Sequence, residues 1–116
     1  MIICDPGDIF LVRFPFSESS NTKKRPALIL SIGENNESFG LVTVAMISSQ
    51  VQTTKLLGDL LLVDWVSENL LHPSILRLSK VATLDRKLLI SKLGTISKKD
   101  YVSAKKEFKK VFSYWH

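Results

Sequence analysis

Apolar residues gather in short runs along residues 1–93, and segments rich in Gly, Pro, Asn or Ser separate these runs. The runs predict six strands, at residues 9–14, 27–31, 39–47, 58–63, 74–81 and 88–93. The first run lacks a clean apolar–polar alternation, which indicates a strand covered on both faces, as in a small closed barrel. Proline cannot donate to a strand ladder, so Pro26 is placed just before the second strand, at its first position. On the fifth strand, strict alternation would put Arg77 and Ser79 on one side and Lys80 on the other.

The last twenty residues change to a helical pattern. Ser97 is followed three residues later by Asp100, as in a helix N-terminal capping box. An apolar stripe then recurs at three- and four-residue intervals: Tyr101, Ala104, Phe108, Val111, Phe112 and Trp115. Such a stripe predicts an amphipathic helix that buries its aromatic side chains in the core. Together the elements predict a mainly β fold, an SH3-like small barrel of about six strands with a C-terminal amphipathic helix, in one domain over residues 1–116.

Composition narrows the class of protein. The chain has 116 residues, of which 45% are hydrophobic and 23% charged, as in a globular domain large enough to bury its own core. Cys4 is the only cysteine, so no internal disulfide can form and a reducing compartment is expected. No apolar run reaches the ~18 residues of a membrane-spanning helix. The N-terminus lacks the basic region of a signal peptide, and we therefore expect a cytoplasmic protein without membrane contact.

The positive charge says less about function than its size suggests. The formal net charge is +5, but residues 97–116 alone contribute six lysines against Asp100 and Glu107. The rest of the chain is close to neutral. A solvated helix face accounts for this distribution as well as a nucleic-acid site does, so charge alone does not identify a partner.

Few arrangements of catalytic residues are present. The two histidines lie far apart, no cysteine pair exists, and the acidic residues show no metal-ligand spacing, so neither a metal nor another cofactor is expected. The sequence also has no serine-nucleophile elbow and no glycine-rich phosphate loop. What remains is Arg25, before the second strand, and Ser48 with Ser49, after the third.

Strand ends of a small barrel meet at a common rim, so Arg25 and these hydroxyls could face one cleft. Arginine binds a phosphate through a planar fork of donors, and a serine hydroxyl adds a directed donor. This pair suits phosphodiester chemistry on RNA, since the substrate brings its own nucleophile in the 2′-OH. The residues alone leave open that Arg25 is an ordinary loop arginine and that the serines simply end a strand.

Four segments resemble the PemK/MazF-like toxins of bacterial type II toxin–antitoxin systems. They are GDIFLVRFPF (7–16), KKRPALILS (23–31), VAMISSQ (44–50) and HPSILRLSKVATLDRKLLISKLGTIS (72–97), which follow in family order. The resemblance implies an SH3-like barrel that forms homodimers and cuts single-stranded RNA at short sequence motifs without a metal. It also implies a cognate antitoxin whose acidic or apolar tail lies across the RNA groove.

The resemblance assigns roles to residues of this chain. Arg25 matches the catalytic arginine of the R-P pair, Ser48 matches the hydroxyl after the third strand, and Ser49 is its neighbour and alternative. Gln50 matches the family's glutamine. Some members carry an arginine and an aspartate two apart on the fifth strand; Arg77 matches the arginine, but Ser79 stands in place of the aspartate. A serine cannot act as a general base without an activator, so the base must be water or a loop residue such as Glu18.

The remaining candidates concern RNA binding and alternatives to cleavage. Lys23, Lys24 and Arg77 would attract the RNA backbone, and Phe16 could stack on an unpaired base. A non-enzymatic poison of DNA gyrase on the same fold is a second hypothesis, suggested by the C-terminal aromatic pair Tyr114 and Trp115. An inactive RNA-binding barrel is a third, which the serine at position 79 keeps open.

Overall fold

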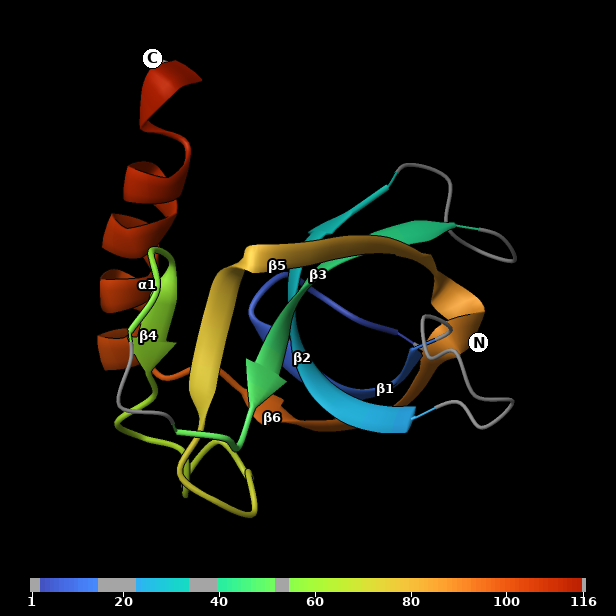
Figure 1. Ribbon diagram of the computed structural model, residues 1–116. Helices are drawn as coiled ribbons and strands as arrows, with labels where there is room; N and C mark the ends of the chain where they lie inside the picture. Colours follow the sequence, from blue (N-terminus) through green and yellow to red (C-terminus); the bar gives the residue numbers. More distant parts are fainter. Residues whose placement is uncertain (1–2, 15–22, 34–39, 52–54, 116) are drawn as a thin grey trace.

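Six strands form one antiparallel sheet that curls round on itself, and a single long helix lies against its outside (Figure 1). The protein is described by a computed structural model over residues 3–14, 23–33, 40–51 and 55–115. The strands are β1 (Asp8–Phe14), β2 (Lys23–Ile32), β3 (Leu41–Ser48), β4 (Asp59–Leu61), β5 (Ile75–Asp85) and β6 (Leu89–Thr95). They lie in the order β4-β5-β3-β2-β1-β6. The predicted mainly β barrel-like fold is confirmed.

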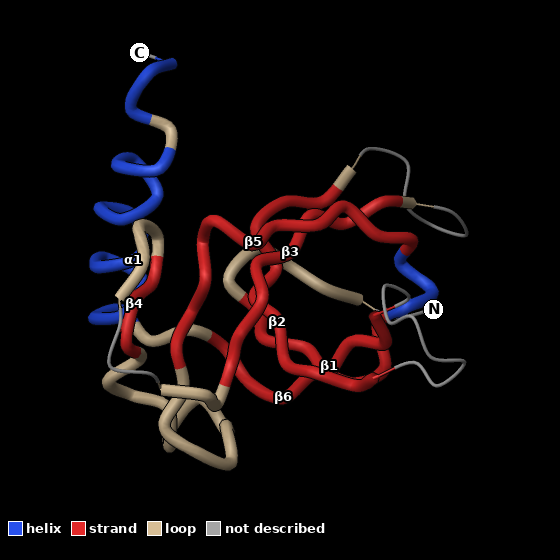
Figure 2. Tube along the Cα trace, viewed as in Figure 1, coloured by secondary structure: helices blue, strands red, loops and turns tan. Residues whose placement is uncertain are grey.

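Helical structure follows the strands. The 3₁₀ turn η1 (Arg86–Leu88) joins β5 to β6, and α1 (Lys98–Val111) and the 3₁₀ turn η2 (Ser113–Trp115) end the described chain. Figure 2 shows the strands gathered into one rounded body with α1 standing beside it.

The sheet buries both of its faces, in two separate cores. Successive side chains of a strand point to opposite faces, so Phe10 belongs to the core inside the curl while its neighbour Ile9 belongs to the core under α1. On β2, Ile29 and Leu28 divide in the same way. This explains the first run's lack of alternation: nearly every position of β1 has a core to face.

The N-terminus of α1 is fixed as predicted, and it is also tied to a distant segment. The Ser97 hydroxyl accepts the backbone N–H of Asp100 at 3.1 Å. The Asp100 carboxylate in turn accepts the backbone N–H groups of Val63 and Asp64, at 3.0 and 3.1 Å. One helical turn therefore holds the loop that connects β4 to β5.

The prediction that the aromatic stripe of the helix packs in the core is wrong. The face of α1 that is buried consists of Asp100, Ala104 and Glu107. Tyr101, Phe108, Phe112 and Trp115 are all exposed, at 51%, 42%, 40% and 86% of their surface. Of the predicted stripe only Ala104 and Val111 meet the core, and the Asp100 carboxylate on the same buried face accepts a backbone hydrogen bond from Val63.

Strand boundaries correct three further expectations. Pro26 lies inside β2 rather than at its start; pairing with β3 begins only at Ala27, so the segment from Lys23 to Pro26 pairs with β1 alone, where a missing N–H is tolerated. β5 runs four residues beyond the predicted end, to Asp85, because β3 pairs with it as far as that residue. Gly94 lies within β6 rather than after it.

Candidate functional site

The register of the sheet brings Arg25 and Ser48 to one rim. Ala27 on β2 pairs with Met46 on β3, and Leu28 with Ala45. The described pairing of β2 with β3 begins at Ala27, and continuing the same register two residues further would set Arg25 opposite Ser48. Both residues line one cavity of about 220 Å³, as the sequence predicted for strand ends that share a rim.

A bulge in β5 adds a residue that alternation had placed elsewhere. On β3, Ala45 pairs with Val81 and the next residue, Met46, pairs with Arg77, so the three residues between them on β5 are extra to the ladder. Such an irregularity breaks the two-residue period. Lys80 and Arg77 consequently line the same cavity, and the prediction that they lie on opposite sides of the strand is wrong.

The cavity is strongly basic. Its lining consists of Arg25, Met46, Ile47, Ser48, Gln50, Arg77 and Lys80. Three of these side chains are cations, and none of these lining residues is acidic. Arginine forks and a lysine amine around a hydroxyl and an amide form a site suited to a phosphate group.

Among the described residues, the Ser48 hydroxyl makes one hydrogen bond. Its Oγ accepts the backbone N–H of Gln50 at 3.1 Å, which turns the chain at the end of β3. Within the part of the chain that the structure describes, this leaves the hydroxyl proton available to donate into the cavity. Ser49 is exposed and does not belong to the lining, so Ser48 is the better placed of the two hydroxyls.

Arg77 donates a hydrogen bond to Asp59, which lies on the neighbouring strand β4. Its Nε donates to Oδ1 of Asp59 at 3.2 Å, and the two residues are register partners on β5 and β4. Ser79 is exposed on the bulge and does not line the cavity. Sequence reasoning missed Asp59 because β4 has only three residues and its pairing with β5 leaves no pattern in the sequence.

The other predicted binding residues lie apart from the cavity or outside the description. Lys23 and Lys24 are exposed at the start of β2 and are not part of the lining. Phe16 and Glu18 fall outside the described residues. Among the described residues, no group of three or more His, Cys, Asp or Glu side chains is placed to hold a metal ion.

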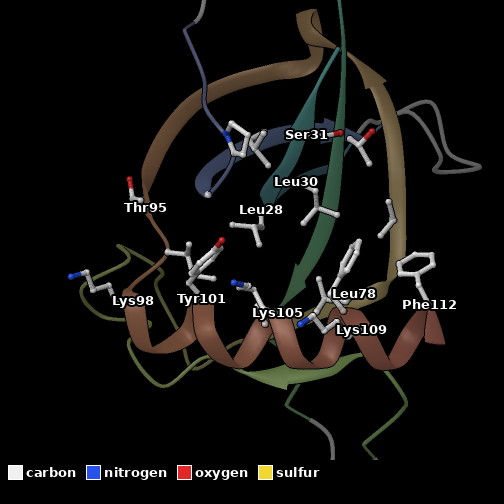
Figure 3. A pocket seen from close by; sticks show the side chains of 18 residues that line it. Leu28, Leu30, Ser31, Leu78, Thr95, Lys98, Tyr101, Lys105, Lys109 and Phe112 are labelled. Atoms are coloured by element: carbon white, nitrogen blue, oxygen red, sulfur yellow. The ribbon is translucent and has the colours of Figure 1, made fainter. Parts of the chain in front are cut away.

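A second and larger cavity, of about 720 Å³, lies between the sheet and α1 (Figure 3). Leu28 and Leu30 face it from β2, and Tyr101, Phe108 and Phe112 face it from the helix. The ring centroids of Phe108 and Phe112 are 4.8 Å apart, so these two rings pack against each other along the cavity. Lys98, Lys105 and Lys109 lie along the same helix edge. We call this cavity the helix groove.

The carboxyl group of Glu68, which lies beside the start of α1, has a raised pKa. Burial, together with the neighbouring carboxylates of Asp100 and Asp64, raises the pKa of Glu68 to about 7, against a lowering by the Ser97 N–H. That N–H donates to Glu68 Oε2 at 2.8 Å, while Oε1 is buried without a hydrogen-bond partner among the described residues. The protonated acid can donate to Asp100, so the neutral form is favoured up to near neutral pH.

Over the residues that the structure describes, no helix is both long enough and apolar enough to cross a membrane.

Comparisons with known proteins place the fold and the family. A family model described as the PemK-like, MazF-like toxin of type II toxin–antitoxin systems matches residues 5–112. Among solved structures, the Mycobacterium tuberculosis toxin MazF-mt6 is 23% identical with a TM-score of 0.70, covering 91% of this chain and 96% of that one. A comparison with curated proteins finds no match.

Two further structures come from mycobacterial species. An endoribonuclease in complex with its cognate antitoxin is 13% identical, with a TM-score of 0.71 and coverage of 92% of both chains. A second endoribonuclease is also 13% identical, with a TM-score of 0.68, covering 93% of this chain and 89% of that one. At sequence identities this low, these structural likenesses show that the fold is shared.

Proposed function

The chain belongs to the PemK-like, MazF-like toxins of type II toxin–antitoxin systems, and from that premise we propose that it is a metal-independent, sequence-specific endoribonuclease acting on single-stranded RNA. The observation that carries the proposal is the basic cavity at the rim, where Arg25, Arg77 and Lys80 surround the Ser48 hydroxyl. The similar mycobacterial structures that are described as endoribonucleases support it.

The chemistry is an internal transfer at phosphorus. The 2′-oxygen of the substrate forms a new bond to phosphorus while the bond to the 5′-oxygen breaks, leaving a 2′,3′-cyclic phosphate and a 5′-OH end. The 2′-OH gives its proton to water, and the departing 5′-oxygen takes one from Arg25 or from solvent. Because the substrate carries its own nucleophile, the protein has to position the phosphate and stabilise charge on its oxygens.

Roles for the rim residues follow from their donors. Arg25 donates to the non-bridging oxygens as negative charge develops on them, and Ser48 donates its hydroxyl proton to one of the same oxygens. Arg77 and Lys80 attract the backbone and hold the phosphate, with Gln50 at the edge of the site. Lys23 and Lys24 add positive charge that attracts the approaching RNA backbone. Ser49 is proposed as an alternative hydroxyl, Phe16 as a ring that stacks on a base, and Glu18 as a general base.

The test is cleavage of a mixed RNA pool by purified protein, with the cyclic-phosphate ends mapped. Arg25→Ala should lower the cleavage rate about 100-fold or more, as when a transition-state donor is removed elsewhere. Its circular dichroism spectrum and melting temperature should stay unchanged. Lys106→Ala is the matched control, since it removes one positive charge from the exposed face of α1. Wild-type protein that leaves the pool intact would show that the proposal is wrong.

The gyrase-poison hypothesis keeps one supporting observation. Tyr114 and Trp115 are 95% and 86% exposed at the end of the described chain, where they could reach a protein target. Growth arrest separates the two functions with the same variant. Arg25→Ala should lose toxicity if the toxin is a nuclease and keep it if the toxin is a poison. An inactive RNA-binding barrel would retain RNA on a filter without producing new ends.

The partners we propose are single-stranded RNA, a cognate antitoxin and a second copy of the chain. The basic rim fits an acidic antitoxin tail that competes with RNA. The helix groove fits the second copy: it ends at Phe112, and Tyr114 and Trp115 project just beyond. A two-fold axis near this end would lay each aromatic pair over the other copy's groove.

A substrate such as messenger RNA makes the cytoplasm the proposed compartment. We also propose that residues 1–116 form a single domain.

A further inference from the structure

One local structure occurs twice in the molecule, at the start of β1 and at the start of β4. In each case an aspartate opens the strand directly after a glycine of positive φ, 96° before Asp8 and 89° before Asp59. Each aspartate accepts, on Oδ2, the backbone N–H of the residue three places earlier, Asp5 at 2.8 Å and Leu56 at 3.2 Å. Each donates its own N–H to that residue's carbonyl at 3.0 Å. Both side chains are almost wholly buried.

The two copies differ in the cation that they hold. Asp8 Oδ1 lies 3.2 Å from the amine of Lys92, a half-exposed residue on β6. Asp59 Oδ1 lies 3.2 Å from Nε of Arg77, which lines the basic cavity. The two turns thus make the same backbone hydrogen bonds. Of the two aspartates, Asp59 alone contacts a residue that lines the basic cavity.

The geometry of the second pair fixes an orientation as well as a charge. A guanidinium is planar, so a hydrogen bond from Nε to a buried carboxylate restricts both its position and the plane of its fork. Asp59 is itself held by the Leu56 N–H and by its place on β4. Its side chain is 4% exposed and does not line the cavity, whereas that of Arg77 is 23% exposed and does. The carboxylate therefore acts on the cavity only through the arginine.

We infer that Asp59 is a positioning residue for RNA cleavage, which holds the Arg77 guanidinium in the orientation that receives the substrate phosphate. The inference rests on the proposed nuclease function and deepens it. It gives this chain a carboxylate partner for the fifth-strand arginine that comes from the neighbouring strand β4 and stays out of contact with the RNA. The bulge that carries Lys80 into the same cavity begins at the residue after Arg77.

The experiment is a double-mutant cycle on the full chain with a short RNA that the wild type cleaves. Asp59→Asn keeps the shape and one acceptor but loses the charge, and it should lower kcat/KM on the order of 10–100-fold, the effect of a small misplacement of a positioned group. Arg77→Gln should lower it by at least as much. In the double variant the Asp59 substitution should cost less than a further twofold, because its target is already gone. Asp8→Asn is the matched control and should cleave as the wild type does.

Arg77→Lys guards against a variant that folds poorly. It changes a partly exposed side chain, retains the positive charge and lacks the planar fork, so it should cleave as slowly as Arg77→Gln. Full activity of Arg77→Lys, or wild-type activity of folded Asp59→Asn, would overturn the inference and leave the nuclease function intact. So would an Asp59 effect that persists undiminished in the Arg77→Gln background. Wild-type protein that cuts no RNA would overturn both.

Discussion

Glu68 should make the stability of the protein depend on pH in a way that one substitution removes. Its pKa is raised from 4.5 to about 7 by burial and by the carboxylates of Asp100 and Asp64. The folded protein therefore holds a proton that the unfolded chain has already lost between these two pH values. Stability from this group is complete below pH 4.5, falls as the pH rises through 7, and stays low above it.

The size of the effect follows from the two pKa values. Each tenfold change in proton affinity corresponds to about 1.4 kcal/mol, so the ionisation of Glu68 costs on the order of 3 kcal/mol across the window. Glutamine at this position imitates the neutral acid: its oxygen can accept the Ser97 N–H, and its amide can donate to Asp100. Glu68→Gln should match the wild type near pH 4.5 and exceed it by about 2–3 kcal/mol at pH 8, or roughly 10 °C in melting temperature for a chain of this size.

Urea unfolding followed by circular dichroism, at several pH values between 4.5 and 8, measures both proteins. The difference between them isolates Glu68, since every other titrating group is shared. The reasoning is wrong if the wild type and Glu68→Gln show parallel pH dependence, or if the variant is the less stable of the two at pH 8. A change in the slope against urea would mean that the unfolded state differs as well.

Two other substitutions test features that the sequence did not reveal. Gly94→Ala would place a Cβ 2.6 Å from the backbone oxygen of Glu68. Because the backbone cannot move aside easily, we expect the free energy of unfolding, measured with urea, to fall by about 2–3 kcal/mol. An unchanged unfolding midpoint would contradict the close packing of β6 against the backbone of Glu68. The double substitution Phe108→Ser, Phe112→Ser should convert a dimer to a monomer in sedimentation velocity, because exposed aromatic side chains dominate such interfaces. A wild type that stays monomeric, or a variant that still dimerises, would rule the helix groove out as the contact between copies; loss of antitoxin binding alone would assign it to that partner.

The rim could be predicted in part because strand ends are visible in the sequence. Arg25 lies near the start of β2 and Ser48 at the end of β3, and because these neighbouring strands are antiparallel, both residues come to the same edge of the sheet and line one cavity. Lys80 could not be placed in the same way, because its side depends on a bulge that only the pairing of β3 with β5 creates. Asp59 and Arg77 are eighteen positions apart in different strands, and no periodicity links them.

For the helix, the sequence predicted the element but not the face that is buried. Its start, its cap and its amphipathic period were all readable, yet the period could not say which side faces the protein. Burial of Asp100 and Glu107 is stable only because particular backbone N–H groups and lysines meet them, and those partners lie up to 52 residues away along the chain. Apolar pattern alone assigns the aromatic side to the core, and this assignment fails where polar contacts decide the packing.

The clamp that Asp100 places on Val63 and Asp64 also sets an order of assembly during synthesis. β4 is a three-residue edge strand that pairs only with β5 among the described strands, and Val111 of α1 lies beside Gly58, the residue before it. A ribosome releases α1 only after all six strands have emerged, and segments fold as they appear. We therefore expect the Asp59–Arg77 pair, which β4 brings to the rim, to be the part of the site completed last. A nascent toxin is thus expected to acquire its full phosphate site only after α1 has emerged from the ribosome.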